Sequence, residues 1–121
     1  MYDHIGLAVK DIALSVRFYT AVLAPLGYVL CSSDETSAGF GPKDAPALWL
    51  YASKNEPRPA ATHVAFSAST RKAVDRFHAA AIEAGGRDNG PAGVRADYAP
   101  TYYAAFVLDP DGNNVEAVCM K

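Results

Sequence analysis

The chain has 121 residues, the size of a single domain, and half of them are hydrophobic. A net charge of −2 provides no basic surface for nucleic acid, so we expect no such partner. No apolar run approaches the roughly 18 residues that a membrane-spanning helix requires, and the first residues lack the basic and apolar regions of an export signal. We therefore expect a cytoplasmic protein that does not enter a membrane.

The first predicted elements are a strand and a helix. The stretch DHIGLAV, residues 3–9, is short and mainly apolar, which is typical of a strand. Apolar residues at steps of three and four then predict a helix over about 12–24. Asp11 is suited to cap the start of this helix, and Pro25 ends it by restricting the residue before it.

Three strand-like runs complete the first half: YVLCSS (28–33), SAGFG (37–41) and ALWLYA (47–52). The second half begins with another short strand, THVAFSA, at residues 62–68. A helix over about 70–84 follows, with Ser69 or Thr70 as its cap. Gly85 suits the left-handed turn at the end of this helix.

A glycine-rich segment, residues 85–100, precedes the last two strand-like runs, YYAAFVLD (102–109) and NNVEAVCM (113–120). The motif DPDGN, residues 109–113, joins these two runs. Its proline presets a turn conformation and Gly112 supplies a positive φ angle, so the motif predicts a hairpin.

The two halves of the chain repeat each other. Placing His4 over His63, an offset of 59, overlays the two opening strands and aligns the two predicted helices. Aligning the final strands places Trp49 opposite Glu116, an offset of 67. The difference between these offsets means that the second half carries about eight extra residues, which we expect in the loop 88–100.

This repeat predicts an α+β fold of two βαβββ modules, about 1–55 and about 60–121, within one domain that spans 1–121. Two modules of this size pack together because neither buries its apolar face alone. The alternative is a chance similarity between two βα units.

The repeated histidines lie on strand faces that are otherwise made of small residues. Because side chains alternate along a strand, His4 shares its face with Gly6 and Ala8, and His63 shares its face with Ala and Ser. The small residues leave space beside each imidazole, which suggests a cavity. Glu116 lies in the apolar final strand, where a carboxylate needs a cation, a hydrogen-bond donor or solvent.

If the repeat brings Glu116 to the face of the histidines, then His4, His63 and Glu116 form a facial set of metal ligands. Such a set leaves coordination positions open, and chemistry takes place at those positions. The alternative is a module without metal in which both histidines are packed or hydrogen-bonded. His78, in the middle of the second predicted helix, is expected to be solvated or packed rather than a ligand.

The chain resembles the vicinal oxygen chelate superfamily, also called the glyoxalase/bleomycin-resistance/dioxygenase fold. The resemblance covers essentially the whole chain, and it rests on DHIGLAVKDIALSVRFYTAVLAPLGY, THVAF and FVLDPDGNNVEAV. It implies that the two modules pair into a curved mixed sheet around a divalent metal held by His4, His63 and Glu116. Trp49 stands where glyoxalase I-like enzymes carry a fourth ligand, so the chain departs from that pattern.

The resemblance implies an enzyme that acts by Lewis-acid catalysis on a small substrate with vicinal oxygens, of lyase, isomerase or dioxygenase type. The implied cofactor is Fe, Mn, Ni or Zn. The alternatives are a fosfomycin-type thiol transferase and a non-catalytic small-molecule-binding protein like the bleomycin-resistance proteins. The resemblance also implies a homodimer, in which His4 serves a site in its own chain or in the partner chain. No separate general base is evident.

Six aromatic or cationic residues are candidates for the wall of a substrate pocket: Trp49, Tyr51, Arg95, Tyr98, Tyr102 and Tyr103. Tyr98 and Tyr102 are expected to close this pocket, and Arg95 is expected to attract an anionic substrate. The alternative for each of the six is an ordinary surface or core position.

Overall fold

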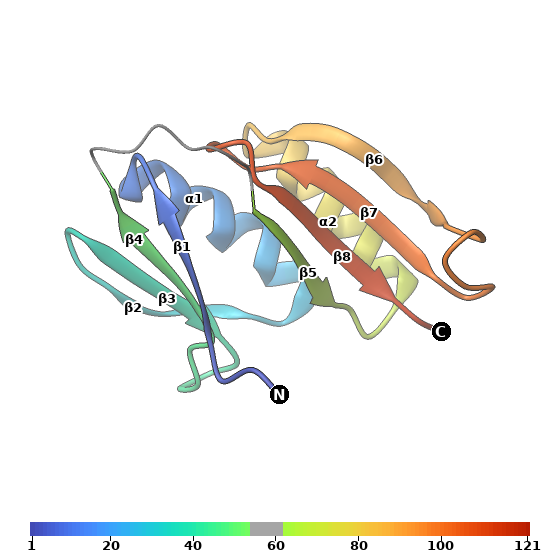
Figure 1. Cartoon of the computed structure of the whole chain (residues 1–121), viewed down its shortest axis with the longest axis horizontal. Coiled ribbons are helices and arrows are strands. Elements are labelled where there is room, and N and C mark those ends of the chain that lie inside the picture. Colours follow the sequence, from blue (N-terminus) through green and yellow to red (C-terminus); the bar gives the residue numbers. More distant parts are fainter. Residues whose placement is uncertain (54–61) are drawn as a thin grey trace.

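The computed structural model describes residues 1–53 and 62–121, and its elements follow the order βαβββ twice (Figure 1). The predicted boundary between the modules, about 55–60, lies outside the described residues. The first module contains β1 (Ile5–Val9), α1 (Ile12–Leu23), the short 3-10 helix η1 (Ala24–Leu26), β2 (Val29–Ser33), β3 (Ser37–Gly41) and β4 (Leu48–Ala52). The second contains β5 (His63–Ser67), α2 (Arg71–Glu83), β6 (Arg87–Val94), β7 (Tyr103–Leu108) and β8 (Asn114–Cys119).

Both helices begin at the predicted caps. The side chain of Asp11 accepts a hydrogen bond from the backbone N–H of Leu14, and the side chain of Thr70 accepts one from Ala73. Each bond satisfies an N–H that has no partner within its helix. Within the described residues, neither helix is long and apolar enough to cross a membrane.

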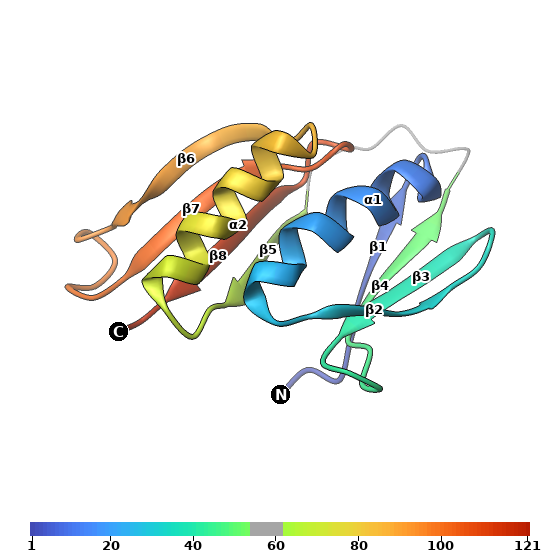
Figure 2. The same ribbon diagram turned by 180° about the vertical axis from the view of Figure 1, so that it is seen from behind.

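The strands form two separate four-stranded sheets, in the orders β1-β4-β3-β2 and β5-β8-β7-β6. Figures 1 and 2 show α1 and α2 side by side on one side of both sheets. We call the other side of the two sheets the open face. The architecture confirms the predicted α+β fold of two βαβββ modules, but the sheets do not close around a cavity.

The strand registers agree with the alignment of the two halves. In the first module β1 and β4 are parallel, and Gly6 pairs with Trp49. In the second module β5 and β8 are parallel, and Ala65 pairs with Glu116. Trp49 and Glu116 therefore occupy equivalent positions on the open face of their respective sheets.

The extra residues of the second half lie only partly in a loop. Part of the predicted loop 88–100 belongs to β6, which has eight residues where β2 has five. The loop after β6 spans 95–102, whereas the equivalent loop of the first half spans only 34–36. Register shifts around Gly90 interrupt the pairing of β6 with β7, which is how a strand accommodates added residues.

The DPDGN hairpin fixes the second module to the first. Gly112 adopts a φ of 83°, as predicted for the turn. The carboxylate of Asp109 is buried, and it accepts hydrogen bonds from the Tyr19 hydroxyl of α1 at 2.6 Å and from the side-chain amide of Asn113 at 2.8 Å. A backbone N–H of the turn, that of Asp111, binds the same carboxylate at 2.9 Å. This buried network ties the turn to the helix layer.

Candidate functional site

Residues on β5 face the predicted sides. His63, Ala65 and Ser67 are exposed on the open face, whereas Val64 packs into the core beneath the helices. Small residues beside His63 leave its imidazole half exposed to solvent. His63 therefore lies at the surface beside small residues, but it does not line the pocket described below, so the predicted cavity beside it stays a prediction.

Glu116 is the buried acid of this region. It lies on β8, and only 2% of its surface is exposed. One carboxylate oxygen, Oε2, lies 3.1 Å from Nε2 of His63, and the other, Oε1, accepts a short hydrogen bond from the hydroxyl of Tyr102. A carboxylate removed from water in this way requires such partners, and here each oxygen has one.

The second ring nitrogen of His63 fixes the orientation of the imidazole. Nδ1 lies 3.0 Å from the backbone carbonyl oxygen of Asn114. Because a carbonyl oxygen only accepts hydrogen bonds, Nδ1 must carry a proton. Nε2 then points to Glu116, and it is the nitrogen that is available to ligate a metal.

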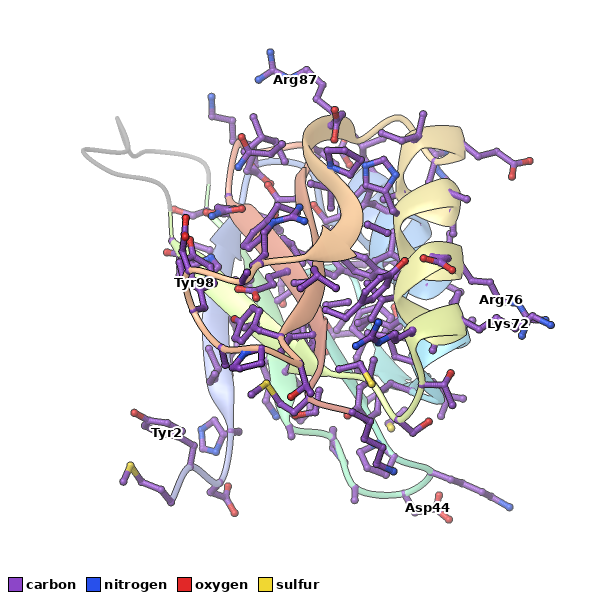
Figure 3. All side chains as sticks on the ribbon, turned by 90° about the vertical axis from the view of Figure 1, so that its right-hand side faces the viewer. Tyr2, Asp44, Lys72, Arg76, Arg87 and Tyr98 are labelled. Atoms are coloured by element: carbon purple, nitrogen blue, oxygen red, sulfur yellow. The ribbon has the colours of Figure 1, made fainter. Side chains whose placement is uncertain are left out.

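The loop 95–102 covers Glu116. It carries Tyr98 and Tyr102, whose rings meet edge to face with centroids 5.1 Å apart. Burial and the hydrogen bond to Glu116 raise the pKa of Tyr102 to about 12, so this phenol stays neutral and remains a donor at physiological pH. Figure 3 shows Tyr98 on the side of the molecule away from α2.

Arg95 and Phe106 extend the site along the sheet. The guanidinium carbon of Arg95 lies 5.4 Å from the centroid of the Phe106 ring, and that ring is stacked with His63 at 6.4 Å. Phe106 pairs with Glu116 in the register of β7 and β8. The structure thus brings together five side chains: His63, Arg95, Tyr102, Phe106 and Glu116.

Tyr103 does not belong to this group, contrary to the expectation that it lines the pocket. Its hydroxyl donates a hydrogen bond to Asp75 of α2 at 2.6 Å, and Arg71 of the same helix lies over its ring. Side chains alternate along β7, so Tyr103 points toward the helices when Phe106 points to the open face. The hydrogen bond to Asp75 raises the pKa of Tyr103.

Trp49 and Tyr51 lie on the open face of the first sheet. A Cβ atom added to Gly39 would lie 2.9 Å from the ring of Trp49, and one added to Gly6 would lie 3.0 Å from the ring of Tyr51. These two glycines leave room for the aromatic rings to lie flat on the sheet. Within one chain the two rings belong to the first module, whereas the His63 and Glu116 pair belongs to the second.

His4 also lies apart from that pair. It precedes β1, half exposed, with Nδ1 at 2.6 Å from a carboxylate oxygen of Asp3. Figure 1 shows β1 and β5 running in opposite directions, β1 upward and β5 downward in that view. In the described parts of the chain, no three His, Cys, Asp or Glu side chains are grouped so that they could hold a metal ion.

A pocket of about 310 Å³ lies along the seam between the two sheets. His4, Tyr28, Phe40 and Phe66 are among its lining residues, whereas His63 and Glu116 are not. The pocket adjoins the carboxylate site at Ala65, which lines the pocket and pairs with Glu116. His78 is not part of either region: it lies on α2, and its Nε2 is 2.9 Å from a carboxylate oxygen of Asp88 on β6.

Sequence reasoning overlooked Phe106 and the carbonyl oxygen of Asn114. Phe106 lies on the face of β7 opposite to Tyr103, and it pairs with Glu116 in the strand register. The backbone contact of His63 with Asn114 has no signal in the sequence, because any residue type at that position supplies a carbonyl oxygen.

The model of the Glyoxalase/Bleomycin resistance protein/Dioxygenase superfamily matches residues 2–117, and the chain belongs to this superfamily. A crystal structure of a glyoxalase/bleomycin resistance protein from Albidiferax ferrireducens T118 is similar over 98% of both chains, with 29% identity and a TM-score of 0.84. No curated protein matches the chain.

More distant structures share the fold. A glyoxalase/bleomycin resistance protein/dioxygenase family enzyme from Burkholderia phytofirmans PsJN is 18% identical over 98% of both chains, with a TM-score of 0.76. A glyoxalase-related enzyme from Fulvimarina pelagi is 20% identical, covers 95% of this chain and 84% of its own, and has a TM-score of 0.74.

Proposed function

We propose that the protein is a divalent-metal-dependent enzyme that acts on a small substrate with vicinal oxygens. The observation that carries this proposal is the pairing of His63 with the buried carboxylate of Glu116, with each side chain held by a further partner. Ligating histidines characteristically donate their second N–H to a carbonyl or carboxylate, and ligating carboxylates are themselves hydrogen-bonded. Asn114 and Tyr102 supply these partners here.

The donor set suits the proposed cofactor. Imidazole nitrogen and carboxylate oxygen are ligands for Fe, Mn, Ni and Zn, which are the metals that the resemblance implies. Ligation by Nε2 of His63 requires that this nitrogen carry no proton, and Nδ1 can keep its contact with the carbonyl oxygen of Asn114. The metal would then replace the direct contact between His63 and Glu116.

The third ligand in this proposal is His4 of the partner subunit in a homodimer. Within one chain β1 and β5 run in opposite directions, and His4 lines the pocket between the sheets, whereas His63 does not. The proposal therefore takes His4 and His63 of one metal site from different chains. A second copy with its open face against the first can supply His4, and the twofold symmetry of a dimer creates two equal sites.

A bound cation would supply Lewis-acid polarisation of the two adjacent substrate oxygens. Tyr102 holds Glu116 in place and keeps its hydroxyl proton at neutral pH. Tyr98 packs edge to face against Tyr102. Trp49 and Tyr51 of the partner subunit would form the opposite wall. Lyase, isomerase and dioxygenase reactions are all compatible with this arrangement.

One observation favours a second candidate, a small-molecule-binding protein that needs no metal. The open face presents aromatic rings on both sheets, Trp49 and Tyr51 on the first and Phe106 on the second. Two such surfaces brought together in a dimer would enclose a planar ligand without ligation. Measuring the metal content of the purified protein separates this candidate from the first.

Subunit complementation tests the proposal. His4→Ala and His63→Ala chains are purified separately, unfolded together and refolded as a mixture, and bound Ni(II) is measured by mass spectrometry after gel filtration. Neither variant alone should hold metal. In the mixture, a heterodimer has one site with both histidines mutated and one intact site, so metal binding should return to about one quarter of the wild-type level, since half of the dimers are heterodimers.

Two results would overturn the proposal. Wild-type protein that takes up no metal would exclude the metal site itself. Metal binding by the wild type without any recovery in the mixture would exclude His4 of the partner subunit as the third ligand. The oligomeric state of each protein is checked by sedimentation, because a monomer cannot share a site.

A further inference from the structure

Arg95 is fixed in place by its backbone and by its side chain. Its N–H donates to the carbonyl of Tyr102 at 2.7 Å, and its carbonyl accepts from Tyr98 at 2.9 Å, so it closes the loop that carries both tyrosines. Its guanidinium donates to the carbonyl of Pro91 at 2.6 Å and lies over Phe106. These contacts hold the cation against the sheet rather than in free solvent.

Two glycines of β6 make room for this cation. A Cβ atom added to Gly90 or to Gly93 would lie 3.2 Å from a guanidinium nitrogen. Gly90 also has a φ of 146°, a conformation that residues with a side chain rarely adopt. The irregular, glycine-rich strand β6 therefore leaves the space that the Arg95 side chain occupies.

Arg95 has no acidic partner within the described residues. The ion pairs found there all involve histidine: His4 with Asp3, His63 with Glu116 and His78 with Asp88. Of the five N–H donors of the guanidinium, the only one with a protein acceptor in that part of the chain is the one that binds Pro91. An immobilised guanidinium with free donors is suited to a planar carboxylate or to a phosphate.

The guanidinium of Arg95 is close to the proposed metal site. Phe106 contacts both, with its ring centroid 6.4 Å from that of His63 and 5.4 Å from the guanidinium carbon of Arg95. These distances place Arg95 within reach of a small molecule that also touches His63. Phe106 offers an apolar surface to the part of such a molecule that would lie between His63 and Arg95.

We propose that Arg95 binds an anionic group, a carboxylate or a phosphate, at the far end of a substrate whose vicinal oxygens face His63 and Glu116. This inference rests on the proposed function and adds the substrate class: a small acid with a chelating end and an anionic end, joined by a short apolar linker that lies on Phe106.

A matched pair of probes tests the inference. Ni(II)-loaded protein is titrated by calorimetry with 2-oxoadipate, which has a chelating end and a distal carboxylate, and with 2-oxohexanoate, which lacks that carboxylate. Wild-type protein should bind 2-oxoadipate about tenfold more tightly, the usual effect of a hydrogen bond to a charged group. Arg95→Met should remove this preference, and Arg95→Lys should restore part of it.

Arg87→Met is the control variant. Arg87 starts β6 but projects from the end of the sheet (Figure 3), and its side chain has no ion pair or ring contact within residues 1–53 and 62–121. Its loss should leave the preference for 2-oxoadipate unchanged. A preference that survives Arg95→Met in a folded, metal-loaded protein would overturn the inference, as would equal affinity of the wild type for both probes.

A second measurement needs no metal. Metal-free protein is titrated with inorganic phosphate, and the Nε–H resonances of its arginines are followed by NMR. The Arg95 resonance should shift and saturate, and the Arg87 resonance should not. If the protein takes up no metal but phosphate still shifts Arg95, the proposed function fails and the anion site stands. If the protein binds metal, but phosphate does not shift the Arg95 resonance and the two oxo acids bind equally well, the anion site is excluded and the proposed function stands.

Discussion

The hydroxyl of Tyr102 donates a hydrogen bond to the buried carboxylate of Glu116, although the two residues lie on different elements. Tyr102 ends the loop before β7, and Glu116 lies in the middle of β8. The loop thereby covers a carboxylate that would otherwise be exposed on the open face. The bond leaves Oε2 directed at His63, so it orients Glu116 for the role proposed above.

Tyr102→Phe should therefore weaken both stability and metal binding. Glu116 would lose the partner of Oε1, and a buried acceptor left without a donor costs about 1–3 kcal/mol. Loss of a residue that orients a ligand typically reduces metal affinity by about tenfold or more. Urea unfolding and a chelator competition with Ni(II) measure the two effects.

Tyr98→Phe is the matched control, because it keeps the ring packed on Tyr102 and removes a hydroxyl without a hydrogen-bond partner in the described parts of the chain. Tyr98→Phe should change neither the unfolding free energy nor the affinity for Ni(II). If Tyr98→Phe and Tyr102→Phe lower both quantities equally, the role assigned to Tyr102 is wrong.

Asp109→Ala should destabilise the fold more than Tyr102→Phe does. The substitution removes the shared acceptor of the Tyr19 hydroxyl, the Asn113 side chain and the N–H groups of the turn. Losing an acceptor shared by several buried donors should lower the unfolding free energy by about 3 kcal/mol. Tyr19→Phe removes one of these donors and should cost about 1 kcal/mol.

Asp97→Asn is the control for urea unfolding of the Asp109 series. Asp97 is exposed in the loop 95–102 and makes no hydrogen bond or ion pair with any described residue. If Asp109→Ala lowers the unfolding free energy no more than Asp97→Asn does, the turn does not anchor the second module.

The charge of Asp88 should stabilise the protein at neutral pH and not in acid. The N–H of Gly90, and then His78, lower the pKa of this carboxyl from its ordinary value of 3.8. Because the folded-state pKa is lower than the unfolded one, the stabilisation is complete above the unfolded value. It is lost as the pH falls through the folded value. The unfolding free energy should therefore decline below about pH 4.

Asp88→Asn should make this decline shallower, since its side-chain oxygen still accepts from Gly90 but carries no charge. Asp44→Asn serves as the control, because Asp44 is exposed and its side chain makes no hydrogen bond or ion pair with any described residue. Urea unfolding between about pH 2 and 7 gives the comparison. An acid decline as steep in Asp88→Asn as in the wild type would mean that other carboxylates dominate it.

The features that sequence predicted well are local or repeated. A cap such as Asp11 binds an N–H three residues away, so residue type alone indicates it. The equivalence of Trp49 and Glu116 follows from the repeat, because duplicated modules conserve strand register. The face of His63 follows from the alternation of side chains along a strand.

The features that sequence did not predict depend on contacts between distant segments. Gly90, Pro91 and Gly93 are poor strand formers, so β6 was expected to be a loop. The repeat also leaves open how the modules pack, and their antiparallel arrangement is what separates His4 from His63 within a chain. The partnership of Tyr102 with Glu116 results from the path of the loop 95–102.

Trp49→Glu should create a second carboxylate at the position equivalent to Glu116. Trp49 lies half-buried on the open face, over Gly39 and away from the helices, so the substitution does not bury a charge in the core. The new side chain would share its face with His4, as Glu116 does with His63, and in the proposed dimer it would reach the metal of the partner subunit. Metal affinity should rise by about tenfold, which is the size of effect that residues around a bound metal typically have.

Trp49→Gln is the control, because glutamine has the shape of glutamate without its charge. This variant should not raise the metal affinity. Chelator competition gives the affinities, and equal values for the Glu and Gln variants would show that this position does not face the metal.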